Sequence, residues 1–397
     1  MGFMINSFRL QKLENDFVST AEIIRSAVND KRPIWIRHHN DCDGYCAAIA
    51  LEKAILKKLH DFHVKESDVF FFYKRFPTKT PFYDYSDATR DISLSLAEAE
   101  RFNRKQPLLI IVDNGSSKED LFALKKLQVY GIDVVVVDHH PNSIDAEPLL
   151  KGHINPHKIG EGSDLTAAML CAELGRLIDG TIEDAELLAA TGGIADKSDS
   201  EEIEQYIKMS EEKGFSREYL ENVAEVIDFE SGQLLNLEAR QYVRELLFGD
   251  YERQRAIVDI VKGEIEQEKQ KILSVISEYI QYEENENHIL AWIDTDDYFN
   301  QRKLFFSKIA GLAKKHLEEK LDKPVVVLGY GDEIITIRND KTLLSDVNEL
   351  IKKLKEKFPY YMVQGGGHKN AGSIHFARHA KENIIKETMD YMRSKNG

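Results

Sequence analysis

The stretch Ile132–His140, IDVVVVDHH, decides the fold class of this chain. Its four consecutive valines are β-branched and apolar, and no polar residue separates them. Such a run is typical of a strand that is buried on both faces of a parallel sheet. The run stops at Asp138, His139 and His140, and ligands of open parallel sheets bind beyond the carboxyl ends of the strands. The sequence therefore predicts that the chemistry of this protein takes place at this end of the strand.

Two other stretches repeat this pattern. Pro107–Gly115, PLLIIVDNG, is an apolar run that ends in Asp113 and a turn. Arg32–Gly44, RPIWIRHHNDCDG, is a shorter run that is followed by four potential ligands: His38, His39, Asp41 and Asp43. A single Asp after a strand is usually a turn former or a helix cap. Three strands that end in carboxylate or imidazole indicate one shared metal site instead.

The order of elements predicts the fold class. Strand and helix alternate through the N-terminal half, which indicates an α/β fold with a doubly wound, mostly parallel sheet. We expect a catalytic domain over 1–200, a helical insert and connector over 201–285, and a smaller α/β domain over 286–397. The segments Lys74–Asp91 and His153–His157 (HINPH) show little periodicity, so we expect loops there.

Composition and charge limit the class of protein. The net charge of −15 argues against a protein that coats nucleic acid. Residues 290–397, however, carry more Lys and Arg than Asp and Glu. An acidic body with a mildly basic C-terminal part suits a metal-dependent enzyme with a phosphate-bearing substrate. Three cysteines provide no disulfide framework, no apolar run approaches a membrane span and the N-terminus lacks a secretory signal pattern, so we expect a cytoplasmic protein without membrane contact.

The polar residues at the strand ends can hold two divalent cations. Asp41 and Asp43 can each face one ion if their loop is extended, and Asp113 on the middle strand is the natural bridge. Of Asp138 and His139, one can ligate while the other orients it. Oxygen and imidazole ligands without thiolates suit Mn²⁺ or Mg²⁺, with Zn²⁺ and Co²⁺ as alternatives. The expected reaction is hydrolysis of a phosphoester or anhydride.

Three further residues or segments are candidates. Asp196, in the Gly-rich turn TGGIADKSDS, is a candidate bridge to the metal site, although an isolated Asp at such a place is more often a helix cap. Gln364–Ser373, QGGGHKNAGS, is expected to be a Gly-rich loop whose backbone amides bind an anion, with His368 and Lys369 as additional donors. Arg338, at the end of the strand ITIR, is a plausible phosphate clamp. The alternatives are a plain flexible turn and a surface arginine.

The motifs HHNDCDG, VDNG, VDHH and IAD, in this order and followed by GGGHKNAG, resemble those of the DHH phosphoesterase superfamily. The chain looks most like the RecJ-like and nano-RNase branch with a C-terminal DHHA1-type domain. The resemblance covers residues 30–200 and 286–397. It implies six metal ligands: His39, Asp41, Asp43, Asp113, His139 and Asp196. It makes His140 a neighbouring catalytic residue beside Asp138, and it leaves open whether His38 exchanges roles with His39.

The resemblance also implies a substrate and a reaction. The substrate-binding residues are expected in the C-terminal domain, facing the metals across a cleft: Arg338, Gly366, Gly367, His368, Lys369 and Asn370. The implied activity is a two-metal exonuclease, with Mn²⁺ or alternatively Mg²⁺, that degrades single-stranded DNA or RNA to mononucleotides.

Two alternatives to the exonuclease stay open. One is a phosphodiesterase or phosphatase for very short oligonucleotides, cyclic dinucleotides or 3′-phosphoadenosine phosphate. The other is a non-catalytic scaffold that binds replication or repair proteins. The expected partners are accordingly single-stranded nucleic acid or short oligonucleotides, with replication and repair proteins as further candidates. The sequence leaves the oligomeric state open.

Overall fold

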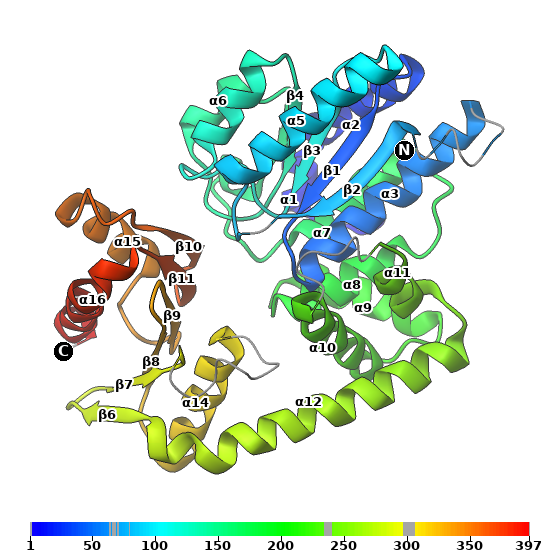
Figure 1. Cartoon of the computed structure of the whole chain (residues 1–397). Coiled ribbons are helices and arrows are strands. Elements are labelled where there is room, and N and C mark those ends of the chain that lie inside the picture. Colours follow the sequence, from blue (N-terminus) through cyan, green and yellow to red (C-terminus); the bar gives the residue numbers. More distant parts are fainter. Residues whose placement is uncertain are drawn as a thin grey trace. The chain divides into compact units, whose positions relative to one another are not determined.

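The computed structural model describes residues 2–396 except 63–64, 66–68, 70, 79, 234–239 and 297–305. These residues form two compact units, Met1–Lys262 and Gly263–Gly397. The boundary falls within the long helix α12 (Tyr251–Tyr279), so the helical region expected at 201–285 is divided between the two units (Figure 1). Within the described part of the chain, none of the helices combines the length and apolar character needed to cross a lipid bilayer.

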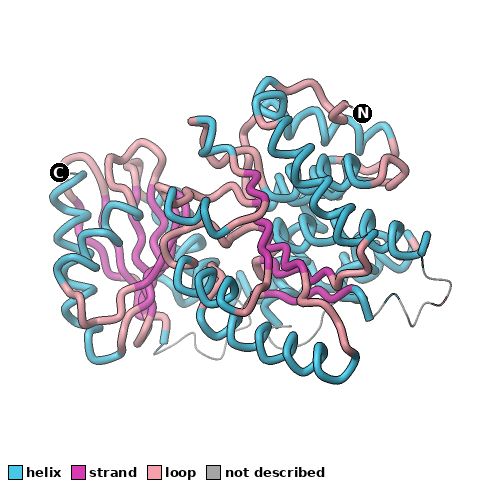
Figure 2. The backbone as a smooth tube through the Cα atoms, turned by 90° about the horizontal axis from the view of Figure 1, so that it is seen from above, coloured by secondary structure: helices cyan, strands magenta, loops and turns pink. Residues whose placement is uncertain are grey.

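The first unit contains a five-stranded parallel sheet, as the sequence predicts. Its strand order is β2-β1-β3-β4-β5, so β3 lies in the middle. The strands are β1 (Ile34–His38), β2 (Tyr73–Pro77), β3 (Leu108–Val112), β4 (Asp133–Val137) and β5 (Gly152–Ile154). Every residue of β1 and β3 is buried, because helices cover both faces of the sheet. Figure 2 shows these strands as one group of magenta segments in the first unit.

Alternate side chains of the strands face two different helix layers. Trp35, Leu109 and Val136 pack with residues of α5 (Tyr85–Phe102) and α6 (Leu121–Val129) in one hydrophobic cluster. The opposite face packs against α2 (Glu14–Asn29), α3 (Cys42–Phe62) and α7 (Ala167–Ile178). The sheet is therefore doubly wound.

The first unit contains several further helices. They are α1 (Phe8–Lys12), α8 (Ala185–Ala195), α9 (Glu201–Glu212), α10 (Arg217–Gln233) and α11 (Arg240–Phe248), with the short helices η1 (Ile144–Leu149) and η2 (Pro156–Ile159). Both α9 and α10 pack directly on α8. Residues that follow position 200 therefore belong to the same compact unit as the sheet.

Two loop predictions are wrong. Lys74–Asp91 contains most of β2 and the first turns of α5, and β2 pairs with β1 along its whole length. The strand escapes detection because it carries charged residues inside: the buried Arg75 is neutralised by Glu52, with Nε 2.9 Å from Oε2. The segment HINPH contains the end of β5, which is only three residues long.

The second unit contains a mixed six-stranded sheet of order β10-β11-β9-β8-β7-β6, in which only the pair β7 and β8 is parallel. Its strands are β6 (Gln281–Glu284), β7 (Ile289–Asp294), β8 (Val325–Tyr330), β9 (Ile334–Asn339), β10 (Gln364–His368) and β11 (Ala371–His375). Its helices are α14 (Phe306–Lys320), α15 (Val347–Lys357), η3 (Arg378–Ala380) and α16 (Lys381–Asn396). A hydrophobic cluster joins the sheet to α15 and α16.

The Gly-rich segment of this unit is a β-hairpin, so the prediction of a loop is wrong. β10 pairs antiparallel with β11, and Lys369 and Asn370 form the turn between them. A Cβ on Gly365 would lie 2.3 Å from the Ser373 carbonyl oxygen, and Gly367 has a φ of 136°. These two glycines are therefore required by the close pairing of the hairpin, whereas a Cβ on Gly366 would meet nothing within 4 Å.

Candidate metal centre

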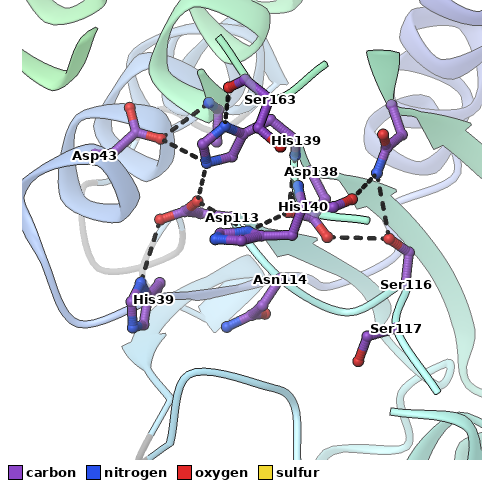
Figure 3. Close-up of polar contacts among 12 residues, drawn as sticks. His39, Asp43, Asp113, Asn114, Ser116, Ser117, Asp138, His139, His140 and Ser163 are labelled. Carbon is purple, nitrogen blue, oxygen red and sulfur yellow. Dashed lines mark hydrogen bonds and ion pairs between the residues drawn. The ribbon is translucent and has the colours of Figure 1, made fainter. Parts of the chain in front are cut away.

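Asp113 lies at the centre of the polar residues that follow the strands of the first sheet. Its Oδ2 is 3.5 Å from His39 Nδ1, and its Oδ1 is 3.2 Å from His139 Nε2 (Figure 3). Its φ of 63° is in the left-handed region, which Asp tolerates better than most residues. Residues from the ends of β1, β3 and β4 thus meet at one buried carboxylate, as expected for the shared edge of a parallel sheet.

The side chains around Asp113 form three groups of potential ligand atoms. One contains His39, Asp41 and Asp113, a second contains Asp43, Asp113 and His139, and a third contains Asp113, Asp138 and His140. We call the first two the ligand groups. Within each group the potential ligand atoms lie within 4.8 Å of one another. Asp113 belongs to both ligand groups, which is the arrangement required of a carboxylate that bridges two ions.

Asp43 is held by the start of a helix rather than by an extended loop. It lies in the first turn of α3, and its two carboxylate oxygens accept hydrogen bonds from the amides of Ala167 and Ala168 at 2.9 and 3.1 Å. These amides begin α7, whose N-terminal partial charge favours a carboxylate. The loop around Asp41 and Asp43 is therefore not extended, and the two residues fall into different ligand groups without that condition.

His139 is oriented by a backbone carbonyl. Its Nδ1 lies 2.6 Å from the carbonyl oxygen of Ser163 and donates to it, which leaves the Nε2 lone pair facing the carboxylates. The carboxylate of Asp196, at the C-terminal end of α8, lies 3.7 Å from this Nε2. The structure therefore places Asp196 beside the ligand group of Asp43 and His139.

His38 and His39 have different surroundings. His39 Nδ1 faces Asp41 Oδ2 at 2.7 Å, in addition to Asp113. His38 is completely buried away from the carboxylates: its Nδ1 lies 2.6 Å from the His39 carbonyl oxygen, and its Nε2 lies 3.4 Å from Nη1 of Arg75. Burial and the Arg75 charge lower the pKa of His38 well below its usual value. The geometry thus places His39, and not His38, among the ligand groups.

Asp138 and His140 form a pair beside the ligand groups. Asp138 Oδ1 accepts from His140 Nδ1 at 2.9 Å and from the backbone amides of His139 and His140. Its other oxygen accepts from Ser116 Oγ at 3.0 Å. Because these donors occupy both oxygens of Asp138, it is better suited to orient His140 than to ligate an ion.

The charges of the centre fit divalent cations. Burial and the neighbouring Asp113 carboxylate raise the pKa of Asp43 well above its usual range. Burial lowers the pKa of His39, but Asp41 and Asp113 outweigh this effect and raise it well above its usual value. His39 Nδ1 and Asp113 Oδ1 are buried atoms without a well-oriented hydrogen bond. A centre with this excess of carboxylate, made of oxygen and imidazole donors, fits Mn²⁺ or Mg²⁺.

The residues expected to bind substrate gather within the second unit. Gly366, Gly367 and His368 lie in β10, and Lys369 and Asn370 form the hairpin turn. Arg338 in β9 lies directly opposite Ala371 of the hairpin, and its Nη1 donates to the Ile337 carbonyl oxygen at 2.9 Å. Burial lowers the pKa of Arg338.

Four residues that contact the candidate site residues are not predicted from the sequence. They are Ser116 on Asp138, Ser163 on His139, Arg75 on His38, and Asn155, whose Nδ2 donates to the His140 carbonyl oxygen at 3.0 Å. Ser116 follows the VDNG motif and Asn155 lies within HINPH, so their positions beside motifs could have suggested a role. Nothing in the local pattern points to Arg75, because its partners come from β1 and α3.

Two comparisons of sequence find similar proteins. A model of the DHH family, N-terminal domain, matches residues 33–194, a range that contains the candidate ligands named above except Asp196. An uncharacterized protein of Methanocaldococcus jannaschii, MJ1198, is 32% identical over 99% of this chain. The chain spans 56% of the length of that relative.

Comparisons of structure agree with the fold. The solved structure of the DHH domain from a member of the s1p family of ribosomal proteins is 31% identical, with a TM-score of 0.92, and covers 100% of this chain and 94% of its own. A crystal structure of the exonuclease RecJ bound to manganese has a TM-score of 0.62 at 15% identity, and covers 95% of this chain and 94% of its own. Both likenesses extend over the two units.

Proposed function

We propose that this chain, which belongs to the DHH family, is a RecJ-like exonuclease that releases mononucleotides from single-stranded DNA or RNA with two Mn²⁺ ions. The observation that carries the proposal is the convergence of ligand side chains from three strand ends and two helices on Asp113. A structure of RecJ with the same fold contains manganese, which supports the choice of ion.

The residues of the centre offer two cation positions. His39 and Asp41 would hold one ion, Asp43 and His139 would hold the other with Asp196 nearby, and Asp113 would contribute to both. When bound, such a pair of cations activates water and neutralises the developing charge of a phosphoryl group. The helix amides on Asp43 and the Ser163 carbonyl on His139 fix two ligands before an ion arrives, so little reorganisation is needed on binding.

His140 supplies a proton in this proposal. Asp138 holds its Nδ1, so the Nε2 remains as the atom that exchanges a proton or contacts a phosphate oxygen. Burial and His139 lower the pKa of His140, but Asp138 outweighs them and raises it. A protonated imidazole at this position serves as a general acid for the leaving oxygen.

The hairpin of the second unit is proposed to hold the phosphates of the substrate. Within the described residues, no carboxylate pairs with the guanidinium of Arg338, although its charge is half-buried beside the hairpin. The backbone amides of the Gly-rich strand β10 and the turn residues Lys369 and Asn370 provide further hydrogen-bond donors in this hairpin. An unpaired buried cation with nearby donors suits a phosphate group.

The test is a length series of labelled DNA and RNA oligonucleotides, from 2 to 20 nucleotides, incubated with Mn²⁺ or with a chelator. We expect Mn²⁺-dependent release of mononucleotides from long single strands, with none from Asp113→Ala. If no single strand releases a mononucleotide, the exonuclease proposal is refuted. Turnover of dinucleotides alone would assign the centre to short substrates instead.

A further inference from the structure

The helices α5 and α6 pack against each other (Figure 1). Two exposed aromatic rings lie side by side at their starts. Tyr85 is the first residue of α5 and Phe122 the second of α6, with 56% and 65% of their surfaces exposed. Their ring centroids are 5.6 Å apart and their planes are inclined by 33°. Lys126 Nζ lies 3.9 Å from the centroid of the Tyr85 ring. We call Tyr85, Phe122 and Lys126 the aromatic patch.

The packing of the fold does not require this patch. The hydrophobic cluster beneath it contains Tyr83, Ala88, Ala123 and Leu124, whereas the two exposed rings lie outside that cluster. Lys126 Nζ also contacts Thr89 Oγ1 at 2.6 Å, but among the described residues it forms no ion pair with a carboxylate. A cation over the exposed Tyr85 ring, without a carboxylate partner among the described residues, is unexpected on a chain with a net charge of −15.

The patch lies at the same edge of the sheet as the metal centre. α5 and α6 follow β2 and β3, whose carboxyl ends lie beside His38 and Asp113. Hydrogen bonds connect the two places: Asp120 accepts from the Tyr83 amide and from the Ser117 amide, each at 2.7 Å. Ser117 follows Ser116, which donates to Asp138. The patch is therefore tied to the centre through one short loop.

We propose that Tyr85, Phe122 and Lys126 form a subsite for nucleotides of a single-stranded nucleic acid outside the metal centre. This inference rests on the proposed function. Exposed aromatic rings stack on bases, and a lysine beside them attracts the phosphate backbone, which together are the features of a single-strand binding surface. Two rings and a cation match one or two nucleotides, while a protein partner would need a larger apolar area.

The test compares the double variant Tyr85→Ala/Phe122→Ala with Phe8→Ala in the full chain. Phe8 is a matched control: it is 69% exposed and has Lys12 Nζ 4.6 Å from its ring centroid, but Lys12 is paired with Glu161 at 3.2 Å. The first readout is the affinity for a fluorescent single-stranded 20-mer in EDTA, where no hydrolysis occurs. We expect the double variant to bind about 10- to 100-fold more weakly and the Phe8 variant to bind normally.

The second readout is turnover with Mn²⁺. The double variant should show a raised KM for the 20-mer, with an unchanged kcat and unchanged turnover of dinucleotides, which also shows that the centre is folded. Lys126→Gln should lower the slope of log affinity against log salt concentration for the 20-mer, by an amount that corresponds to about one released counterion.

The two proposals fail separately. Equal 20-mer affinity of wild type and double variant in EDTA would overturn the subsite, whatever the turnover. Weaker binding by the double variant, combined with no hydrolysis by the wild type, would support the subsite and refute the exonuclease. The same comparison can be made with an abasic 20-mer, which has no bases. If the double variant loses as much affinity for the abasic 20-mer as for the normal 20-mer, the rings do not stack on bases, and the subsite is overturned as well.

Discussion

Asp138 Oδ1 and His140 Nδ1 lie 2.9 Å apart (Figure 3). The two residues lie beside the ligand group of His39 and the ligand group of His139 and belong to neither. Three further donors hold the carboxylate: Ser116 Oγ and the amides of His139 and His140. The carboxylate therefore fixes both the position of the imidazole and the nitrogen that carries its proton.

Removing the Asp138 carboxylate should stop turnover. Asp138→Ala leaves His140 without its partner and is expected to abolish hydrolysis while the fold is retained. Asp138→Asn keeps the shape but weakens the acceptor, so kcat should fall about 10- to 100-fold with little change in KM. Circular dichroism and single-strand hydrolysis by both variants check this. An unchanged kcat in Asp138→Asn would contradict a role in orienting His140.

Asp113→Ala should weaken both cation positions at once, because Asp113 belongs to both ligand groups. Titration calorimetry with Mn²⁺ measures the number of bound ions directly. We expect the wild type to bind two ions. Asp113→Ala should bind both ions much more weakly, and His39→Ala should bind only the ion held by Asp43 and His139. Two-ion binding or retained turnover in Asp113→Ala would remove the bridging role.

The two neighbouring histidines should respond differently to substitution. His39→Ala is expected to lose one Mn²⁺ without a large change in stability. His38→Ala leaves the buried guanidinium of Arg75 without one of its neighbours, so it should lower the free energy of unfolding by about 1–3 kcal/mol but retain two ions. Urea unfolding and Mn²⁺ titration of both variants test this. Loss of an ion in His38→Ala alone would reverse the assignment.

Gly192 sets the space available to Asp43. A Cβ at this position would lie 2.6 Å from Asp43 Oδ1 and 2.4 Å from Ala168 Cβ. Gly192→Ala should therefore lower the free energy of unfolding by about 1–3 kcal/mol and weaken Mn²⁺ binding.

Gly263→Ala, in the exposed helix α12, is the matched control, since its Cβ would meet nothing within 4 Å. It should stabilise the chain by about 0.5–1 kcal/mol. If both substitutions leave Mn²⁺ affinity unchanged, the contact of Gly192 with Asp43 has no role in the site.

Asp120 should make stability depend on pH. Burial raises its pKa from 3.8 to about 7, against the hydrogen bonds from Ser117 and Tyr83 that lower it. Between these values the folded state keeps a proton that the unfolded state releases, so the contribution of Asp120 to stability falls as the pH rises from about 4 to about 7.

Asp120→Asn replaces this titratable carboxyl group with an amide that does not titrate. The difference in unfolding free energy between wild type and variant should therefore shift in favour of the variant as the pH rises through this window, and stay constant above it. Urea unfolding of both proteins at several pH values between 5 and 8 measures this difference. A difference that does not change with pH would contradict the raised pKa.

The sequence by itself determined the α/β class, the three central strands and the residues at their ends. Uninterrupted β-branched runs such as VVVV are typical of a strand covered on both faces, and parallel strands bring their carboxyl ends to one edge. The pair His38 and His39, together with Asp113 and His139, could therefore be placed at one edge of the sheet from local pattern alone. What such a pattern leaves open is which of two adjacent side chains, such as His38 and His39, faces the site.

Only the tertiary structure decided the elements and contacts that depend on distant partners. β2 contains the buried Arg75, whose charge is tolerated inside because Glu52 of α3 neutralises it, so its sequence does not look like that of a strand. The glycines of β10 are fixed by pairing with β11, and the direction of Asp43 is set by amides more than 120 residues away in the chain. These features depend on hydrogen bonds and ion pairs between residues that are far apart in the sequence. The local sequence pattern does not reveal such interactions.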